Sequence, residues 1–381
     1  MKKIPILKTW VEINTKAIAS NIKTFRSILK SSTSLFAVVK SNAYGHGLRT
    51  FSKEANRLGV DGFCVDSVLE GKALREEHIK KPILVLGPTL PGLFGKAREE
   101  KITISVSNWD ALKTFSDKKT GGSYHLKLDT GMHRQGFCPE DFPELVQFVL
   151  SRPSLRRGLS GLFTHFASAK DVSYPSYTLR QIKIFEGARE LFRKRGLKNL
   201  IAHAAATGGT ILYPRAHYDA VRIGIGLYGH WPSREAEIQH AEILGRIVAL
   251  KPVLSWRARI SEVKALRSGD YVGYDLSEGI RRGVQAVIIP VGYWHGFPRA
   301  LSSKGTVIVG GKRGKILGRV SMDMIIAGFK LRSRVRVGDR VTLIGTDHGD
   351  TISAEEFAEQ ADSIHYEVLT RLNPLMERIV I

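Results

Sequence analysis

Cysteine is scarce in this sequence: its 381 residues contain only Cys64 and Cys138. Two cysteines are too few for a disulfide scaffold or a dedicated zinc cluster, so a reducing compartment fits best. Residues 1–10 lack the apolar core of a signal peptide. No segment approaches the roughly 20 apolar residues of a membrane span. We therefore expect a soluble, cytoplasmic protein with no membrane association.

Acidic residues are also few relative to basic ones, with 36 against 58 and a formal net charge of +22. Such an excess favours anionic partners, including nucleic acid and phosphorylated small molecules. However, the basic residues are spread along the chain, and the densest run, 193–195, is typical of a helix end. There is no zinc finger, basic helix or aromatic-rich RNA-binding motif, so nucleic-acid binding is not expected.

The first two-thirds of the chain alternates short apolar runs with amphipathic stretches such as Ala17–Leu29 and Pro139–Leu150. Alternating strands and helices predict parallel strands with right-handed crossovers. Eight such units predict a (β/α)8 TIM-like barrel, with a doubly wound open sheet as the alternative. The eight expected strands are Leu35–Val39, Gly62–Val65, Ile83–Leu86, Thr103–Val106, Tyr124–Leu128, Gly161–His165, Leu200–Ala204 and Ala220–Ile223.

After about residue 240 the pattern becomes β-rich and is interrupted by turn signals, which predicts a mostly antiparallel second domain. We expect the barrel over residues 1–245 and the β-rich C-terminal domain over 246–381. Ser353 followed by Glu356 predicts a capping box at the start of a final helix. The expected β segments are Val253–Val263, Tyr271–Gly273, Val284–Val291, Thr306–Val309, Lys315–Ile326 and Arg340–Ile344.

Candidate catalytic residues follow the strands, because the active site of such a barrel lies at the carboxyl ends of its strands. Lys40 follows an apolar strand, and partial desolvation there would make it a candidate Schiff-base amine. Thr207, Gly224 and Ile225 follow the last two strands, where hydroxyls and bare amides commonly bind phosphate. Either feature alone is weak, since strand-end lysines are usually solvated and glycines usually serve tight turns. Together in one barrel they favour catalysis.

The segment Ala37–Gly47 (AVVKSNAYGHG) closely resembles the cofactor-lysine signature of alanine racemases. The resemblance covers nearly the whole chain, and several long motifs occur in the same order. The further matching segments are Thr9–Ile13, Asn21, His125–Met132, Asp219–Ile225, Gly273–Tyr274, Gly318–Asp323 and Tyr366–Leu369.

This resemblance implies a homodimeric enzyme that interconverts L- and D-alanine with pyridoxal 5'-phosphate and without a metal. In a bacterium it would supply D-alanine for peptidoglycan. Lys40 would hold the cofactor and act as one base, and Tyr274 of the partner subunit would act as the other. The remaining implied roles are Arg222 at the pyridine nitrogen; His165 behind the ring; Tyr44, Thr207, Gly224, Ile225 and Tyr366 at the phosphate; Arg134, Met322 and Tyr293 at the substrate; and Lys127 as a lysine that is carbamylated in some members of the family.

The sequence departs from the usual family pattern near the expected substrate entrance. Lys170 and His295 replace acidic residues, which predicts a more basic entrance, and His133 replaces a glycine beside Arg134. A racemase of another small amino acid, such as serine, remains open. A related decarboxylase would carry a cysteine where this chain has Ser321, and a non-catalytic carrier of pyridoxal phosphate would lack the second domain.

Overall fold

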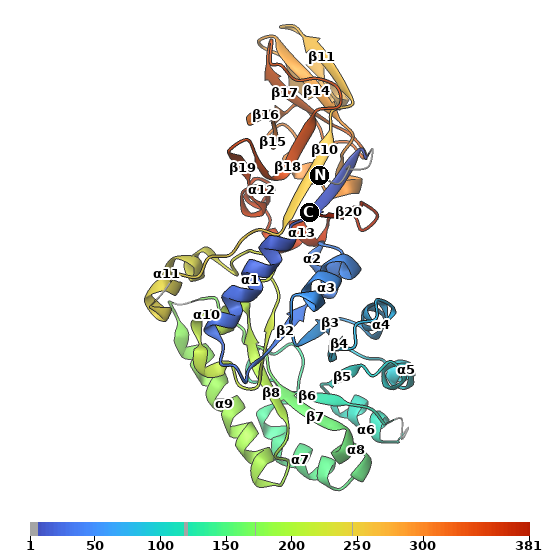
Figure 1. Ribbon diagram of the computed structural model, residues 1–381, viewed down its shortest axis with the longest axis vertical. Helices are drawn as coiled ribbons and strands as arrows, with labels where there is room; N and C mark the ends of the chain where they lie inside the picture. The colour runs from blue at the N-terminus through green and yellow to red at the C-terminus, as the bar shows by residue number, and fades with distance from the viewer. Residues whose placement is uncertain (1–6, 118–120, 172, 246) are drawn as a thin grey trace. The chain divides into compact units, whose positions relative to one another are not determined.

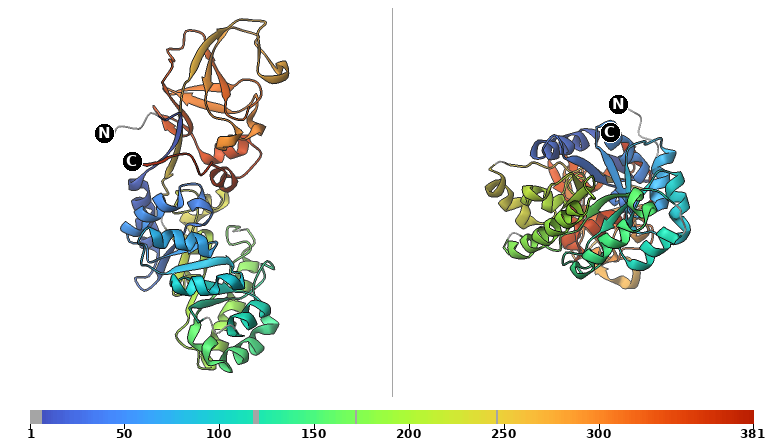
Figure 2. Two further views of the ribbon diagram at one scale, coloured as in Figure 1. Left: turned by 90° about the vertical axis from the view of Figure 1, so that its right-hand side faces the viewer. Right: turned by 90° about the horizontal axis from the view of Figure 1, so that it is seen from below.

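The computed structural model describes residues 7–117, 121–171, 173–245 and 247–381. The chain forms two compact units. The first, here called the β unit, contains the described residues up to Thr15, Asn42–Thr50 and Pro252–Ile381. The second, here called the barrel unit, contains Lys16–Ser41 and Phe51–Lys251. Figure 1 labels their elements, and Figure 2 gives two further views.

The barrel unit is a closed barrel of eight strands, each paired in parallel with its neighbours, which confirms the predicted fold class and excludes the open-sheet alternative. Its strands are short, buried and rich in Val, Ile and Leu, as expected for parallel strands covered by helices. Three of the predicted strands match at both ends, and the others shift by one or two residues. The strands are β2 (Ser34–Val38), β3 (Gly62–Val65), β4 (Ile83–Pro88), β5 (Thr103–Val106), β6 (Tyr124–Lys127), β7 (Leu159–Phe163), β8 (Ile201–Ala206) and β9 (Ala220–Ile223).

The helices of the barrel unit surround these strands (Figure 1). In α1, for example, Ile18, Ile22 and Phe25 are buried on one face, because they recur at helical spacing. The helices are α1 (Thr15–Ile28), α3 (Leu48–Arg57), α4 (Val68–Glu76), α5 (Phe94–Glu99), α6 (Trp109–Asp117), α7 (Phe142–Leu150), α8 (Pro153–Gly158), α9 (Pro175–Lys194), α10 (Thr207–Leu212) and α11 (Arg234–Leu244), with short 3-10 turns η1 (Pro91–Leu93), η2 (Pro139–Asp141) and η3 (Pro214–Ala216).

The β unit is built on one large sheet in the order β11-β14-β17-β16-β15-β18-β10-β1-β20, and β19 also pairs with β18. A small hairpin joins β12 to β13. The elements are β1 (Thr9–Ile13), β10 (Leu254–Arg259), β11 (Glu262–Leu266), β12 (Tyr271–Val272), β13 (Glu278–Gly279), β14 (Val284–Ile289), β15 (Thr306–Val309), β16 (Lys312–Ile316), β17 (Ile325–Lys330), β18 (Arg340–Asp347), β19 (Asp350–Ile352), β20 (Arg378–Val380), η4 (Tyr274–Leu276), η5 (Tyr293–His295), η6 (Arg299–Leu301), α12 (Ala354–Gln360) and α13 (His365–Thr370).

The structure corrects two expectations for the β unit. Two segments predicted as continuous β are interrupted. Within Val253–Val263, β10 ends at Arg259 and β11 begins at Glu262. Within Lys315–Ile326, β16 ends at Ile316 and β17 begins at Ile325. The helix after Ser353 does form, and the Ser353 hydroxyl accepts the Glu356 amide at 3.0 Å. The Glu356 carboxylate forms an ion pair with Arg313, so the predicted capping box is not closed. The helix is α12, and because α13 follows it, it is not the final helix as predicted.

The packing units do not follow a single boundary at residue 245. The early strand β1 pairs antiparallel with β10 and parallel with β20, so the N-terminal segment completes the C-terminal sheet. Buried Glu12 on β1 also forms an ion pair with Arg257 on β10 at 2.9 Å. Among the described residues, no helix is long and apolar enough to cross a membrane.

Candidate active site

Lys40 lies at the carboxyl end of β2, as the sequence predicted, and its ammonium is 3.6 Å from the Asp66 carboxylate beyond β3. The chain then forms the short helix α2 (Lys40–Tyr44), in which Ser41 to Tyr44 have φ between +52° and +56°. These values are left-handed, and each such non-glycine residue costs about 1–2 kcal/mol. Strain of this kind persists where surrounding contacts hold it, and it concentrates at functional sites.

Side chains and turn hydrogen bonds hold this left-handed turn in place. The Ser41 amide donates to the Glu70 carboxylate at 2.8 Å, and the Leu48 amide donates to the Asn42 side chain at 2.8 Å. The left-handed turn was not anticipated from the sequence. The only local signal is Gly45 and Gly47 just beyond it, both with positive φ.

Arg222 on β9 is the centre of a buried hydrogen-bond network inside the barrel, with 2% of its surface exposed. Its guanidinium donates to the carbonyl oxygens of Thr164 at 2.8 Å and Ala204 at 2.9 Å. It also lies 2.5 Å from His203 Nδ1 and 3.4 Å from His165 Nδ1. The structure therefore brings together Arg222 and His165, two of the residues predicted for the site.

The histidines around Arg222 are held neutral. A guanidinium can only donate, so His203 must accept at Nδ1 and carry its proton on Nε2. That proton points to His125 Nδ1, 2.8 Å away. Burial, reinforced by the charge of Arg222, lowers the pKa of His165 to about 3 and the pKa of His125 to about 3. His203 and His125 were not predicted as site residues, because their only sequence signal is a polar residue within a buried strand.

Thr207 and the turn after β9 form a cradle of hydrogen-bond donors. Thr207 is buried, with 4% of its surface exposed, and its hydroxyl accepts a hydrogen bond from the Gly226 amide at 3.3 Å. Gly226 is required here, because a Cβ would lie 2.4 Å from the Phe25 ring. Gly224 and Ile225 are buried, and neither amide donates a hydrogen bond within the described residues. Buried amides without acceptors suit an anion such as a phosphate.

Lys127, at the end of β6, is buried, and its ammonium donates to the Gln135 side chain at 2.8 Å. Burial, together with the charges of Arg134 and Arg222, lowers the pKa of Lys127 to about 8. A neutral amine is the form that carbamylation requires.

Arg134 is exposed, and no hydrogen bond or ion pair involves it within the described residues. Its neighbour His133 has φ +53°, which explains why glycine is usual at that position.

The β unit holds the other predicted phosphate ligands, Tyr44 and Tyr366, whose ring centroids are 6.2 Å apart. Burial raises the pKa of Tyr366, so this side chain remains a neutral phenol that can donate a hydrogen bond to an anion.

The remaining predicted residues of the β unit lie on exposed turns. Tyr274 begins η4 and is 68% exposed, next to an ion pair of Asp275 with Arg319 at 2.6 Å. The backbone brings Tyr293 to the Met322 turn, because the Tyr293 amide donates to the Ser321 carbonyl at 3.1 Å. No hydrogen bond or ion pair within the described residues joins Tyr274 to these two residues.

The two basic substitutions at the expected entrance differ in what they contribute. His295 accepts the Gly292 amide at Nδ1 at 3.2 Å, and burial lowers its pKa. It therefore acts as a neutral cap of a turn and adds no charge at neutral pH, contrary to the expectation. Lys170 is exposed and remains the basic departure.

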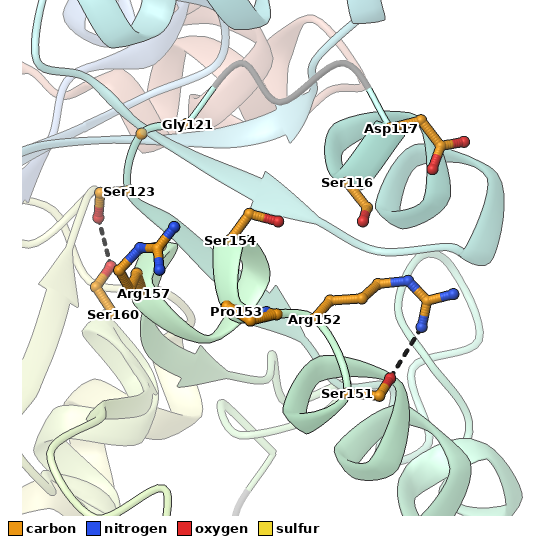
Figure 3. Close-up of a pocket in the computed structure, with 12 residues that line it drawn as sticks. Ser116, Asp117, Gly121, Ser123, Ser151, Arg152, Pro153, Ser154, Arg157 and Ser160 are labelled. Atoms are coloured by element: carbon orange, nitrogen blue, oxygen red, sulfur yellow. Dashed lines mark hydrogen bonds between the residues drawn. The ribbon is translucent and has the colours of Figure 1, made fainter.

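A cavity of about 910 Å³ lies at the opposite end of the barrel, beside the amino ends of β6 and β7. Figure 3 shows its serine and arginine side chains, including Ser123 and Ser160, whose hydroxyls are 2.5 Å apart. None of the predicted site residues lines it. The residues predicted to be catalytic in the barrel unit instead follow the carboxyl ends of the strands, where active sites of such barrels lie.

A closed barrel with a strand-end lysine, a buried arginine and a donor cradle, joined to a β unit, defines the class of barrel-type amino-acid racemases, which are isomerases. Residues 13–232 match the N-terminal domain of alanine racemase, and residues 253–380 match its C-terminal domain. The chain belongs to the alanine racemase family, whose members depend on pyridoxal phosphate. The presence of both domains gives no support to the carrier alternative.

Individual relatives agree with this assignment over their full lengths. An alanine racemase of Leptospira interrogans serovar copenhageni is 34% identical over 98% of this chain and 96% of its own. One of Symbiobacterium thermophilum is 35% identical over 97% and 96%. The solved alanine racemase of Clostridium difficile superposes with a TM-score of 0.90 at 29% identity, covering 100% of this chain and 97% of its own. That of Bacillus anthracis with bound L-Ala-P gives 0.89 at 32%, covering 99% and 96%.

Proposed function

We propose that this chain racemises alanine with pyridoxal 5'-phosphate held on Lys40, and that Lys40 and Tyr274 are the two bases. The observation that carries the proposal is the grouping of Lys40, Arg222 and the Gly224–Ile225 amides at the strand ends of one barrel. The donor set suits the cofactor. Lys40 would offer the primary amine, Arg222 would lie at the ring nitrogen, and the amides, Thr207, Tyr44 and Tyr366 would bind the phosphate.

Racemisation requires a proton to leave one face of the substrate and another to return to the opposite face. When bound, the cofactor withdraws electrons from the substrate Cα and so makes the α-proton acidic. Lys40 Nζ would move the proton on one face and the Tyr274 hydroxyl on the other. Lysine and tyrosine side chains can each accept and return a proton, so one base on each face is sufficient for racemisation.

Arg222 would restrict the reaction to proton exchange. Burial lowers the pKa of Arg222 to about 10, yet the guanidinium still keeps its proton at neutral pH. A retained proton cannot be passed to the pyridine nitrogen, and the neutral His165 and His203 beside it cannot supply one. Arg222 would therefore leave the ring nitrogen unprotonated, which would disfavour side reactions such as transamination.

The substrate carboxylate would be held by Arg134, with help from the Met322 amide and Tyr293. Tyr274 would act in the site of a second copy of this chain, which makes the active form a homodimer. Its side chain is 68% exposed and is therefore free to serve another subunit. The enzyme would act in the cytoplasm, and its product D-alanine would be used for peptidoglycan.

Mixing two inactive variants tests the dimer. Lys40→Ala and Tyr274→Phe should each lack activity alone, and co-refolded mixtures should regain about a quarter of the wild-type rate, because half of the dimers then contain one intact site of two. Tyr271→Phe is a matched control, since Tyr271 is also an exposed tyrosine at 61% and should keep full activity. A mixture that stays inactive while hetero-dimers form would show that both bases come from one chain.

A further inference from the structure

Arg378 on β20 connects separate segments of the β unit, because its guanidinium binds four backbone carbonyl oxygens. Nε and Nη2 donate to the Gly45 carbonyl at 3.2 and 3.0 Å. Nη2 also donates to the Leu372 carbonyl at 3.2 Å. Nη1 donates to the carbonyls of Asn373 at 2.7 Å and Met376 at 2.5 Å. One side chain thus joins two segments that lie more than 300 positions apart in the sequence.

Each of these segments carries one of the two phosphate tyrosines. Gly45 directly follows Tyr44 at the end of the left-handed turn, and Leu372 follows α13, which contains Tyr366. The segments touch at Gly45, where a Cβ would lie 1.8 Å from the Leu369 carbonyl oxygen of α13. The guanidinium therefore lies beside the contact that sets the 6.2 Å spacing of the two tyrosine rings.

We propose that Arg378 is a positioning residue for phosphate binding: it holds the left-handed turn against the α13 segment, and so fixes Tyr44 and Tyr366 as a preformed pair of phenol donors. The inference rests on the proposed function, since the anion in question is the phosphate of pyridoxal phosphate. Arg378 itself need not touch the cofactor.

The chemistry of arginine suits this task better than that of lysine. A planar guanidinium directs several N–H groups in fixed directions, whereas an ammonium carries its three N–H groups on one rotating nitrogen. Four consecutive residues with positive φ would relax toward ordinary backbone conformations if their neighbours did not hold them. Gly45 directly follows that stretch, and the Arg378 guanidinium donates two hydrogen bonds to its carbonyl oxygen.

The test compares two ligands that differ only in the phosphate. Apo-protein is titrated with pyridoxal 5'-phosphate and with pyridoxal, and the ratio of the two Kd values is the readout. Loss of two charge-assisted hydrogen bonds to Gly45 should weaken pyridoxal phosphate binding by about 10-fold or more in Arg378→Met, with pyridoxal binding changed less than about 2-fold. Arg378→Lys keeps the charge without the fork and should give an intermediate loss of about 3-fold.

Arg75→Met is the matched control. Arg75 also binds four backbone carbonyl oxygens, those of Ile79, Lys81, Glu100 and Lys101, but it lies on α4 of the barrel unit. Its loss should lower the melting temperature without changing the ratio of the two Kd values. The proposal is overturned if the ratio of the two Kd values in Arg378→Met equals the wild-type value. If Arg378→Met does not fold, the same comparison is made with Arg378→Lys. Wild-type protein that binds no pyridoxal phosphate would overturn the proposed function, and this inference with it.

Discussion

Replacing Arg222 by lysine separates the geometry of the buried network from its charge. The wild-type guanidinium donates to the carbonyls of Thr164 and Ala204 and to His203 Nδ1, all inside the barrel. The single ammonium of a lysine cannot reproduce this fork, so about two of the three acceptors should lose their donor. Each unsatisfied buried acceptor costs about 1–3 kcal/mol, which gives a loss of about 2–6 kcal/mol in the free energy of unfolding.

Urea unfolding monitored by fluorescence measures this loss, and the racemisation rate is followed in parallel. The positive charge is kept in Arg222→Lys, so the rate should fall because the cation is displaced from its position beside His165. Arg189→Lys is the control: Arg189 stacks on Tyr218 at 4.5 Å on the outside of the barrel, and its change should stay within about 0.5 kcal/mol. If Arg222→Lys unfolds like the control, the network does not stabilise the barrel as argued.

Three further predictions follow from buried charges. Burial lowers the pKa values of His125, His165 and His203, so at a pH below about 6.5 the unfolded chain binds more protons than the folded chain. As the pH is lowered from about 5.5 to 4.5, the free energy of unfolding should therefore fall by about 4 kcal/mol per pH unit. A free energy of unfolding that does not change over this range would contradict the neutrality of the three histidines. Glu12→Gln removes the ion-pair partner of the buried Arg257 guanidinium and should lower the free energy of unfolding by about 3–5 kcal/mol, measured by thermal or urea unfolding. A change below about 1 kcal/mol would refute the importance of this ion pair. The pKa of Lys127 is lowered to about 8, so protein supplied with carbon-13-labelled bicarbonate should form a carbamate on this lysine that NMR detects. Lys127→Gln should give no carbamate signal. If wild-type protein gives no carbamate signal either, Lys127 is not carbamylated.

The barrel was predictable because its strands carry local signals. β3, β5 and β9 are short apolar runs bounded by polar or glycine-rich turns, and they match the expected strands residue for residue. Buried parallel strands are apolar on both faces, so continuous apolar runs mark them without alternation. Lys40 and Arg222 could be identified because barrel chemistry lies at strand ends, and the family motifs then named their roles.

The features that could not be predicted from the sequence depend on contacts between segments that are distant along the chain. β1 pairs with β10 and β20, and nothing within Thr9–Ile13 indicates which strands these would be. The left-handed turn after Lys40 contains no glycine until Gly45, so local preferences argue against it. The neutral cap formed by His295 likewise requires knowledge of where the Gly292 amide points.

The most direct test of the central claim is exchange of the α-proton of L-alanine for deuterium by purified protein supplied with pyridoxal phosphate, with chiral analysis of the product. We predict deuterated D-alanine from wild-type protein and none from Lys40→Ala. Exchange that persists in Lys40→Ala, or wild-type protein that binds the cofactor yet exchanges no proton of alanine, would contradict it.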